Sequence, residues 1–265
     1  MLSIEEIKLL IEKLEKAKAQ DLVSLLETSI NDLKTIKELI ERTDKATGSF
    51  SSKGQSWFRY DLEEKKNIKQ DEPLYLAIKE KIWHFAKTNM YNSLEIGSGH
   101  GTYSKLFLAW HNQFFLELLP ETEKVLRNKF NLPHQKKYVK FFTTDNHSCG
   151  SVPTGAVNFV FSWDTFVFFT KEQINEYLAS IYNILIPGGY VMIQYSDCHF
   201  DVDLEQSKKG YWAYNNKSIM KELIEENNFS IIELDQFKPG QNYAIFKKPG
   251  NVNSIVYNIS ELELD

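Results

Sequence analysis

The glycine-rich stretch 97–101 constrains the fold of this chain more than any other segment. Residues 94–102 read Leu-Glu-Ile-Gly-Ser-Gly-His-Gly-Thr, an apolar strand-like start followed by three alternating glycines. Glycine has no Cβ, so the backbone of such a turn can approach a ligand closely. Helical apolar spacing resumes from Tyr103 to Trp110, and a helix start offers free N–H groups and a positive dipole end. The pattern is GxGxG, with Thr102 where the dinucleotide fingerprint has glycine. We therefore expect a nucleotide-like ligand here.

Strands and helices are predicted to alternate through the rest of the chain. The expected strands are one ending at Ile96 and those at 113–118, 137–143, 157–161 and 190–195, followed by a hairpin of 229–237 and 243–247. The expected helices are 73–88, 103–109, 122–130, 171–185 and 218–228. This order predicts an α/β fold, a mostly parallel sheet with an antiparallel terminal hairpin. Ligands of such sheets bind beyond the carboxyl ends of the strands.

Polar residues follow these predicted strand ends. Glu117 ends the second strand, and its carboxylate suits a ribose diol because it accepts from both hydroxyls. Asp145 follows the third strand and can accept from an adenine amino group, while the backbone N–H of Asn146 can donate to a ring nitrogen. Ser162, Trp163 and Asp164 follow the fourth strand. We expect these residues to converge with the glycine turn.

Four of these segments together resemble the class I S-adenosylmethionine-dependent methyltransferases. They are Leu94–Gly101, Glu117 with Pro120, Thr144-Asp145, and the Pro-Gly-Gly turn of 185–190. The resemblance covers about residues 73–248 and implies a Rossmann-like fold with S-adenosyl-L-methionine as cofactor. It places Glu95 and the glycine turn (Gly97, Ser98, Gly99 and Gly101) at the methionine part, Glu117 at the ribose, and Asp145 with Asn146 at the adenine. Trp163 can stack near the adenine or wall the pocket, and Leu118 and Ser162 are further expected cofactor contacts. Trp163 can equally be an ordinary core tryptophan.

The methyl acceptor is expected to be a small molecule or a saccharide, methylated on oxygen. The fourth strand lacks the Asn/Asp-Pro-Pro-aromatic motif of amino-methylating nucleic-acid enzymes, and the net charge of −5 argues against a phosphate-backbone binder. Asp164 and His199 are the candidate bases, and histidine titrates near neutral pH. Asp164 with Asp197 could instead hold a divalent cation, but a metal-free site is preferred because Cys198 stands where an asparagine is expected. The aromatic insert 199–214 is expected to contact substrate or to be an anchored loop.

Residues 1–55 are predicted to be a helical extension and linker, 56–250 the methyltransferase domain, and 251–265 a tail. The extension can pack on the domain or form a homodimer. Arg59, after the Gly/Ser-rich linker, can hold a carboxylate or phosphate by two hydrogen bonds, while the aromatic residues before it can pin the linker to the core.

The broader character of the chain favours a cytoplasmic protein. The N-terminus lacks the basic and apolar regions of a signal peptide, no apolar stretch is long enough to span a membrane, and Cys149 and Cys198 are expected to be free thiols. In general character the chain resembles bacterial enzymes that methylate capsule or surface-polysaccharide precursors, including those that O-methylate capsular phosphoramidate. Two alternatives remain, an NAD-dependent oxidoreductase and a non-catalytic scaffold of the same fold. Thr102, the Pro-Gly-Gly turn and the terminal hairpin count against the oxidoreductase.

Overall fold

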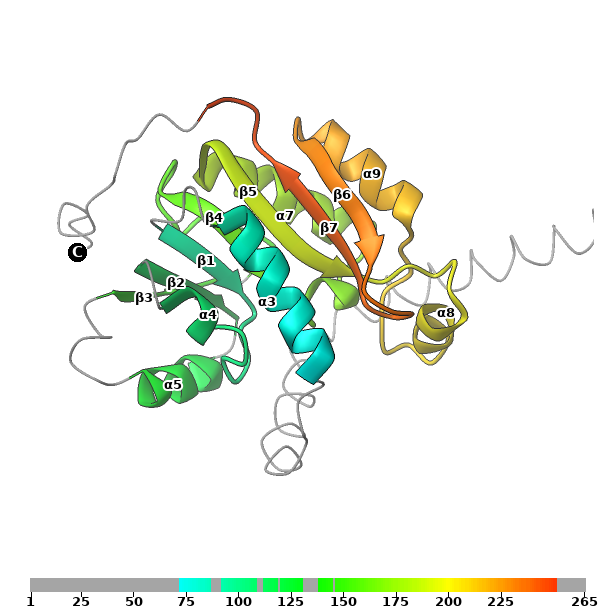
Figure 1. Ribbon diagram of the computed structural model, residues 1–265, viewed down its shortest axis with the longest axis horizontal. Helices are drawn as coiled ribbons and strands as arrows, with labels where there is room; N and C mark the ends of the chain where they lie inside the picture. The colour runs from blue at the N-terminus through cyan, green and yellow to red at the C-terminus, as the bar shows by residue number, and fades with distance from the viewer. Residues whose placement is uncertain are drawn as a thin grey trace, which may run out of the picture. The chain divides into compact units, whose positions relative to one another are not determined.

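The computed structural model describes residues 72–86, 92–108, 112–118, 120–130, 138–144 and 146–251. Within them, one sheet has seven strands in the order β3-β2-β1-β4-β5-β7-β6 (Figure 1). The strands are β1 (Asn92–Ile96), β2 (Asn112–Glu117), β3 (Val139–Thr143), β4 (Val157–Ser162), β5 (Leu185–Tyr195), β6 (Ser230–Gln236) and β7 (Asn242–Lys247). Strands β1 to β5 pair in parallel, and β7 runs antiparallel to both β5 and β6. The predicted α/β fold with an antiparallel terminal hairpin is confirmed.

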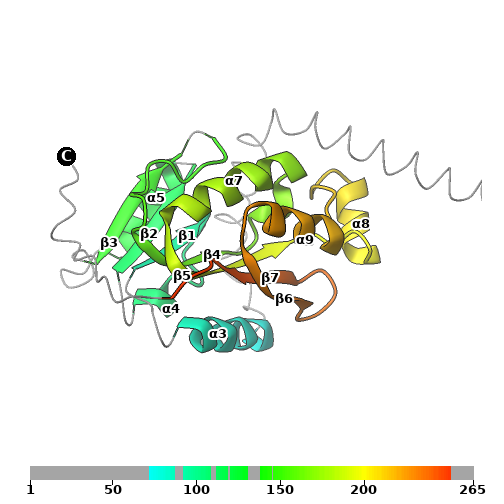
Figure 2. The same ribbon diagram turned by 90° about the horizontal axis from the view of Figure 1, so that it is seen from above.

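Helices cover both faces of this sheet (Figure 2). They are α3 (Glu72–Ala86), α4 (Lys105–Leu108), α5 (Pro120–Lys129), α7 (Lys171–Ile184), α8 (Asp201–Lys208) and α9 (Lys217–Glu226), with a 3₁₀ turn η1 (Phe166–Phe168). Helices α3 and α4 lie on one face, and α7 and α9 lie on the other. None of these described helices has the length and apolarity that a membrane crossing requires. The predicted extension 1–55, Arg59, Asp145 and the tail after residue 251 lie outside the described residues.

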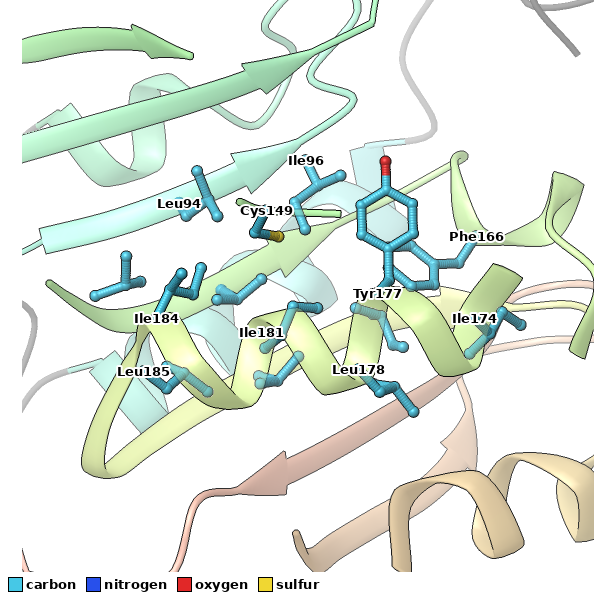
Figure 3. Close-up of a cluster of buried hydrophobic side chains, with 14 of the residues drawn as sticks. Leu94, Ile96, Cys149, Phe166, Ile174, Tyr177, Leu178, Ile181, Ile184 and Leu185 are labelled. Atoms are coloured by element: carbon cyan, nitrogen blue, oxygen red, sulfur yellow. The ribbon is translucent and has the colours of Figure 1, made fainter. Parts of the chain in front are cut away.

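The core follows from the period of each element. Along α7, buried apolar side chains recur every three or four residues, at Ile174, Leu178 and Ile181, and this stripe packs beneath Leu94 and Ile96 of β1 (Figure 3). Burying each such side chain stabilises the fold by about 1.5–3 kcal/mol. On the opposite face, alternate strand residues pack under α3. Both faces of the central strands β1 and β4 are therefore buried, and this burial includes their polar residues.

Helix α7 starts where its sequence specifies. The Thr170 hydroxyl accepts a hydrogen bond from the Gln173 amide (3.4 Å), and the Gln173 side-chain oxygen accepts one from the Thr170 amide (2.9 Å). This reciprocal arrangement is a capping box and satisfies two backbone donors of the first turn. The helix therefore begins at Lys171, as predicted, directly after η1.

The predicted turn at the Pro-Gly-Gly sequence is wrong. Strand β5 begins at Leu185, at the end of α7, and the Pro-Gly-Gly lies within it as an irregularity where the pairing with β4 shifts register. The amide of Gly188 donates to Lys248 O (2.9 Å), and the amide of Lys248 donates to Gly189 O (2.9 Å). Gly188 has a φ of 80°, so the segment is bulged, and pairing with the chain after β7 holds it in the sheet. Nothing local in the sequence encodes that pairing.

Three further segments differ from the sequence prediction. The insert 199–214 contains the helix α8 where a loop was one expectation, and Phe166–Phe168 forms a 3₁₀ turn that was not predicted. The helix expected at 103–109 is confined to α4, because turns occupy residues 99–104. These are short elements, held by contacts with the rest of the fold more than by periodicity.

Candidate functional site

The glycine turn joins β1 to α4 in a conformation that favours glycine. Gly97, Gly99 and Gly101 have φ angles of 67°, 54° and 68°. A Cβ on Gly97 would overlap the Thr165 hydroxyl and lie 2.7 Å from its Cγ2, and a Cβ on Gly101 would lie 2.9 Å from Leu126 Cδ2. A Cβ on Gly99 would meet nothing within 4 Å. The outer glycines are therefore needed for packing, and the middle one faces open space.

Hydrogen bonds tie the neighbouring strand ends to this turn. The amide of Gly97 donates to Leu116 O (3.1 Å), and the Ser162 hydroxyl donates to Ile96 O (2.8 Å). The Thr165 hydroxyl donates to Gly97 O (3.2 Å). The ends of β1, β2 and β4 therefore meet at one edge of the sheet, as the predicted parallel order requires.

Glu117 is buried at this edge and bonded to the glycine turn. Its Oε1 accepts hydrogen bonds from the Ser98 amide (2.7 Å) and from the Ser98 hydroxyl. Burial raises the pKa of Glu117 to about 7, against the opposing effect of the Ser98 hydrogen bonds. Leu118 follows it, half-buried. The structure thus brings three predicted residues, Ser98, Glu117 and Leu118, together.

Glu95 lies beneath the turn, inside the sheet. The Ser104 hydroxyl donates to its Oε2 (2.5 Å), and Gln113 Nε2 lies 3.4 Å from the same oxygen. Burial raises the pKa of Glu95 to about 8, and the Glu117 charge adds to that rise, while the Ser104 hydrogen bond and the Lys129 charge oppose it. Glu95 therefore ties Ser104, just after the glycine turn, to β1, a structural role besides the predicted cofactor contact.

The predicted adenine end is described only in part, because Asp145 lies outside the described residues. Asn146 is exposed, and the Thr144 hydroxyl donates to Asn146 O (2.8 Å). His147, which the sequence analysis missed, makes edge-on ring contacts with Phe169 and Tyr177 at centroid distances of 5.4 and 5.9 Å. Burial lowers the pKa of His147. A single loop histidine carries no pattern that would have revealed this contact.

Trp163 is buried, whereas the next residue, Asp164, is exposed. The Trp163 ring is buried and lies nearly parallel to Phe161, with centroids 6.2 Å apart, in the core beneath α3. This is the placement of a core tryptophan, and a contact with cofactor stays a prediction. Asp164 is exposed with a φ of 55°, and its amide donates to Gln194 Oε1 (2.6 Å). A positive φ at a residue other than glycine is uncommon and marks a position worth functional attention.

His199 lies just after β5, with an exposed ring. Its Nδ1 is 3.4 Å from Oδ1 of the buried Asp197, and its amide donates to the same oxygen (3.2 Å). In the described part of the chain, no group of three or more His, Cys, Asp or Glu residues is placed to hold a metal ion. Cys149 and Cys198 are buried free thiols.

A match to a known protein family covers the segment that contains most of this site. Residues 94–193, from the end of β1 to β5, match the family described as a methyltransferase domain. This segment of the chain is a methyltransferase domain. No protein with a curated description matches the sequence.

Solved methyltransferase structures share the fold of this domain. The N-methyltransferase NodS from Bradyrhizobium japonicum, in complex with S-adenosyl-L-homocysteine, superposes with a TM-score of 0.57 at 12% identity, over 75% of this chain and 99% of NodS. Phosphoethanolamine N-methyltransferase 2 from Haemonchus contortus, in complex with S-adenosyl-L-methionine, gives 0.55 at 16% identity, over 67% and 52%. An O-methyltransferase family protein from Burkholderia thailandensis gives 0.50 at 13% identity, over 69% and 61%. Both N- and O-methyltransferases thus share this fold.

Proposed function

We propose that this methyltransferase acts in the cytoplasm and transfers the methyl group to a hydroxyl oxygen of a small molecule. The acceptor is a saccharide or a nucleotide-linked compound, such as a capsular phosphoramidate precursor. The observation that carries the proposal is the position of Asp164. This exposed carboxyl lies directly before Thr165, whose hydroxyl bonds to the glycine turn. A proton acceptor therefore adjoins the edge at which the cofactor is expected.

The residues at this edge fit S-adenosyl-L-methionine chemically. The open side of Gly99 admits a ligand close to the backbone, and the buried carboxyl of Glu117 can accept from ribose hydroxyls. We assign Asp145 and Asn146 to adenine by their place after β3, and Arg59 to a charged group of cofactor or substrate. When bound, the cofactor supplies a methyl group already activated on a sulfonium.

The task of the protein is then to align the acceptor and remove its proton. As the acceptor oxygen bonds to the methyl carbon, its proton must leave, and Asp164 or His199 takes it up. Asp164 is held from its backbone by Gln194, and His199 is placed by Asp197. Since both side chains are exposed, a released proton can pass on to solvent.

An amine acceptor is the second candidate function. Asp164, Asp197 and Asp203 concentrate carboxyl groups around the ends of β4 and β5, which suits a cationic substrate. Two of the similar structures are also N-methyltransferases. A neutral amine can attack the methyl carbon before it loses a proton, so an amine acceptor depends less than a hydroxyl does on the base, Asp164 or His199.

The test is methyl transfer from radiolabelled S-adenosyl-L-methionine to matched panels of sugar nucleotides, capsular precursors and small amines. We expect labelling of a hydroxyl compound, and about 10²- to 10⁴-fold lower kcat in Asp164→Asn or His199→Ala, whichever is the base, with unchanged affinity for S-adenosyl-L-homocysteine. Asp201→Asn, an exposed carboxyl at the start of α8, is the control. Transfer to amines alone would support the second candidate. Cofactor binding without any transfer would support the scaffold alternative, and binding of NADH instead would support the oxidoreductase.

A further inference from the structure

The segment after β5 sets a buried carboxyl against an exposed imidazole. The side chain of Asp197 is 4% exposed and that of His199 is 61% exposed, although the two residues are separated by one position. Asp197 Oδ1 lies 3.4 Å from His199 Nδ1 and accepts a hydrogen bond from the His199 amide (3.2 Å). Among the described residues, His199 is the one basic side chain at ion-pair distance from Asp197. The Nδ1 atom of the ring therefore lies next to the Asp197 carboxylate, while most of the His199 side chain is exposed.

Asp197 is itself fixed by a second buried carboxyl. Asp203 of α8 is fully buried, and its Oδ2 accepts hydrogen bonds from the Asp197 amide (2.5 Å) and from Asn242 Nδ2 of β7 (2.5 Å). The amide of Phe200 also donates to Asp197 O (2.9 Å). Helix α8 and strand β7 thus hold the backbone at Asp197, just before His199.

The surroundings of this pair are acidic and polar. Tyr195 and Cys198 lie on the same segment, and burial raises the pKa of each, with the Asp197 and Asp203 charges adding to the rise. Burial also raises the pKa of Asp203, to about 6, with the Asp197 charge adding to the rise. The His199 ring therefore has the Asp197 carboxylate beside it, and the buried carboxyl of Asp203 lies next to Asp197.

We propose that Asp197 is a positioning residue that keeps the proton of neutral His199 on Nδ1. The Nε2 atom is then left to take the proton of the methyl acceptor. Asp203 in turn holds the backbone at Asp197 for this task. The inference rests on the proposed hydroxyl methylation and assigns its base to His199. In the reaction, the acceptor oxygen would bond to the methyl carbon while the bond from that carbon to the cofactor sulfur breaks, with its electron pair left on sulfur. The O–H bond of the acceptor would break as well, and its proton would go to Nε2. The carboxylate of Asp197 then faces an imidazolium, which returns its proton to solvent from the exposed side of the ring.

The first measurement does not depend on turnover. Nitrogen NMR of the full chain bound to S-adenosyl-L-homocysteine, at a pH where the ring is neutral, reports which nitrogen of His199 carries the proton. We expect the Nδ1–H form in the native protein and in Asp197→Asn, whose amide oxygen can still accept. We expect its loss in Asp197→Ala, but not in the matched control Asp201→Ala on α8. A native His199 protonated on Nε2 would overturn the proposal.

The second measurement uses methyl transfer. Asp197→Ala should lower kcat about 10- to 100-fold, and Asp197→Asn should lower it less, while the acceptor KM and the affinity for S-adenosyl-L-homocysteine stay within about twofold of native values. Equal activity of Asp197→Ala and Asp201→Ala would overturn the role of the carboxylate. If no hydroxyl compound is methylated, the proposed function fails, and the NMR result still decides separately whether Asp197 sets the proton position. If Asp197→Ala fails to fold, the native protein and Asp197→Asn decide the question.

Discussion

The substitution Gly97→Ala is expected to destabilise the fold because Gly97 combines a left-handed backbone with a close neighbour. A residue with a Cβ at a φ of 67° costs about 1–2 kcal/mol relative to glycine. The new Cβ would also displace the Thr165 side chain, whose hydrogen bond to Gly97 O contributes about 0.5–1.5 kcal/mol. We therefore expect a loss of about 2–3 kcal/mol in the free energy of unfolding.

Gly99→Ala is the matched comparison, since it has nearly the same backbone angle but an open side. It should cost about 1–2 kcal/mol, the backbone part alone. The reduced freedom of the unfolded chain favours both alanine variants equally and cancels in the comparison. Because its methyl group would stand where we expect the cofactor, Gly99→Ala should weaken S-adenosyl-L-homocysteine binding more than its stability loss suggests.

Urea denaturation and calorimetric titration separate the two effects. Gly97→Ala should have the lower denaturation midpoint, and adding Thr165→Ala should recover part of the loss, because it removes the overlapping atoms. If Gly97→Ala is as stable as Gly99→Ala, Thr165 does not pack on the turn as described. If Gly99→Ala binds S-adenosyl-L-homocysteine like the native protein, the open side of the turn is not the cofactor face.

The remaining predictions concern the two buried glutamates. The pKa of Glu95 (about 8) and that of Glu117 (about 7) are raised, so between about pH 4.5 and 8 the folded state binds more protons than the unfolded chain, and its stability falls as the pH rises. Glu95→Gln should flatten this fall in urea denaturation at pH 5, 6.5 and 8, and an unchanged slope would contradict the assignment. Glu117→Gln should weaken S-adenosyl-L-homocysteine binding by about 1.5–3 kcal/mol, which is roughly 10-fold or more. Calorimetric titration measures this loss, and the exposed Glu226→Gln is the control variant. Equal affinities of these two variants would remove Glu117 from the cofactor site.

Much of the fold could be predicted because its signals are local. Apolar runs bounded by turns specify the strands β1 to β4, and the helical spacing of Ile174, Leu178 and Ile181 specifies α7. The order of these elements then dictates a parallel sheet, and parallel strands bring their carboxyl ends to one edge. The convergence of the glycine turn, Glu117 and Ser162 follows from this rule, and the structure contains it.

Other features needed partners distant in the sequence. The Pro-Gly-Gly of β5 is held in the sheet through pairing with Lys248, and α8 is held through Asp203 by Asn242, 39 positions away. The core packing of Trp163 likewise depends on which side of β4 its neighbours occupy.

By itself, the sequence determined the sheet, its order of elements and the edge at which we expect the cofactor, because periodicity and turn residues act over a few positions. Only the tertiary structure decided which partners the carboxyl groups have and how deeply they are buried. Glu95 supports the glycine turn, and Asp197 is buried beside an exposed His199, because burial and hydrogen-bond partners are set by segments that meet only after folding.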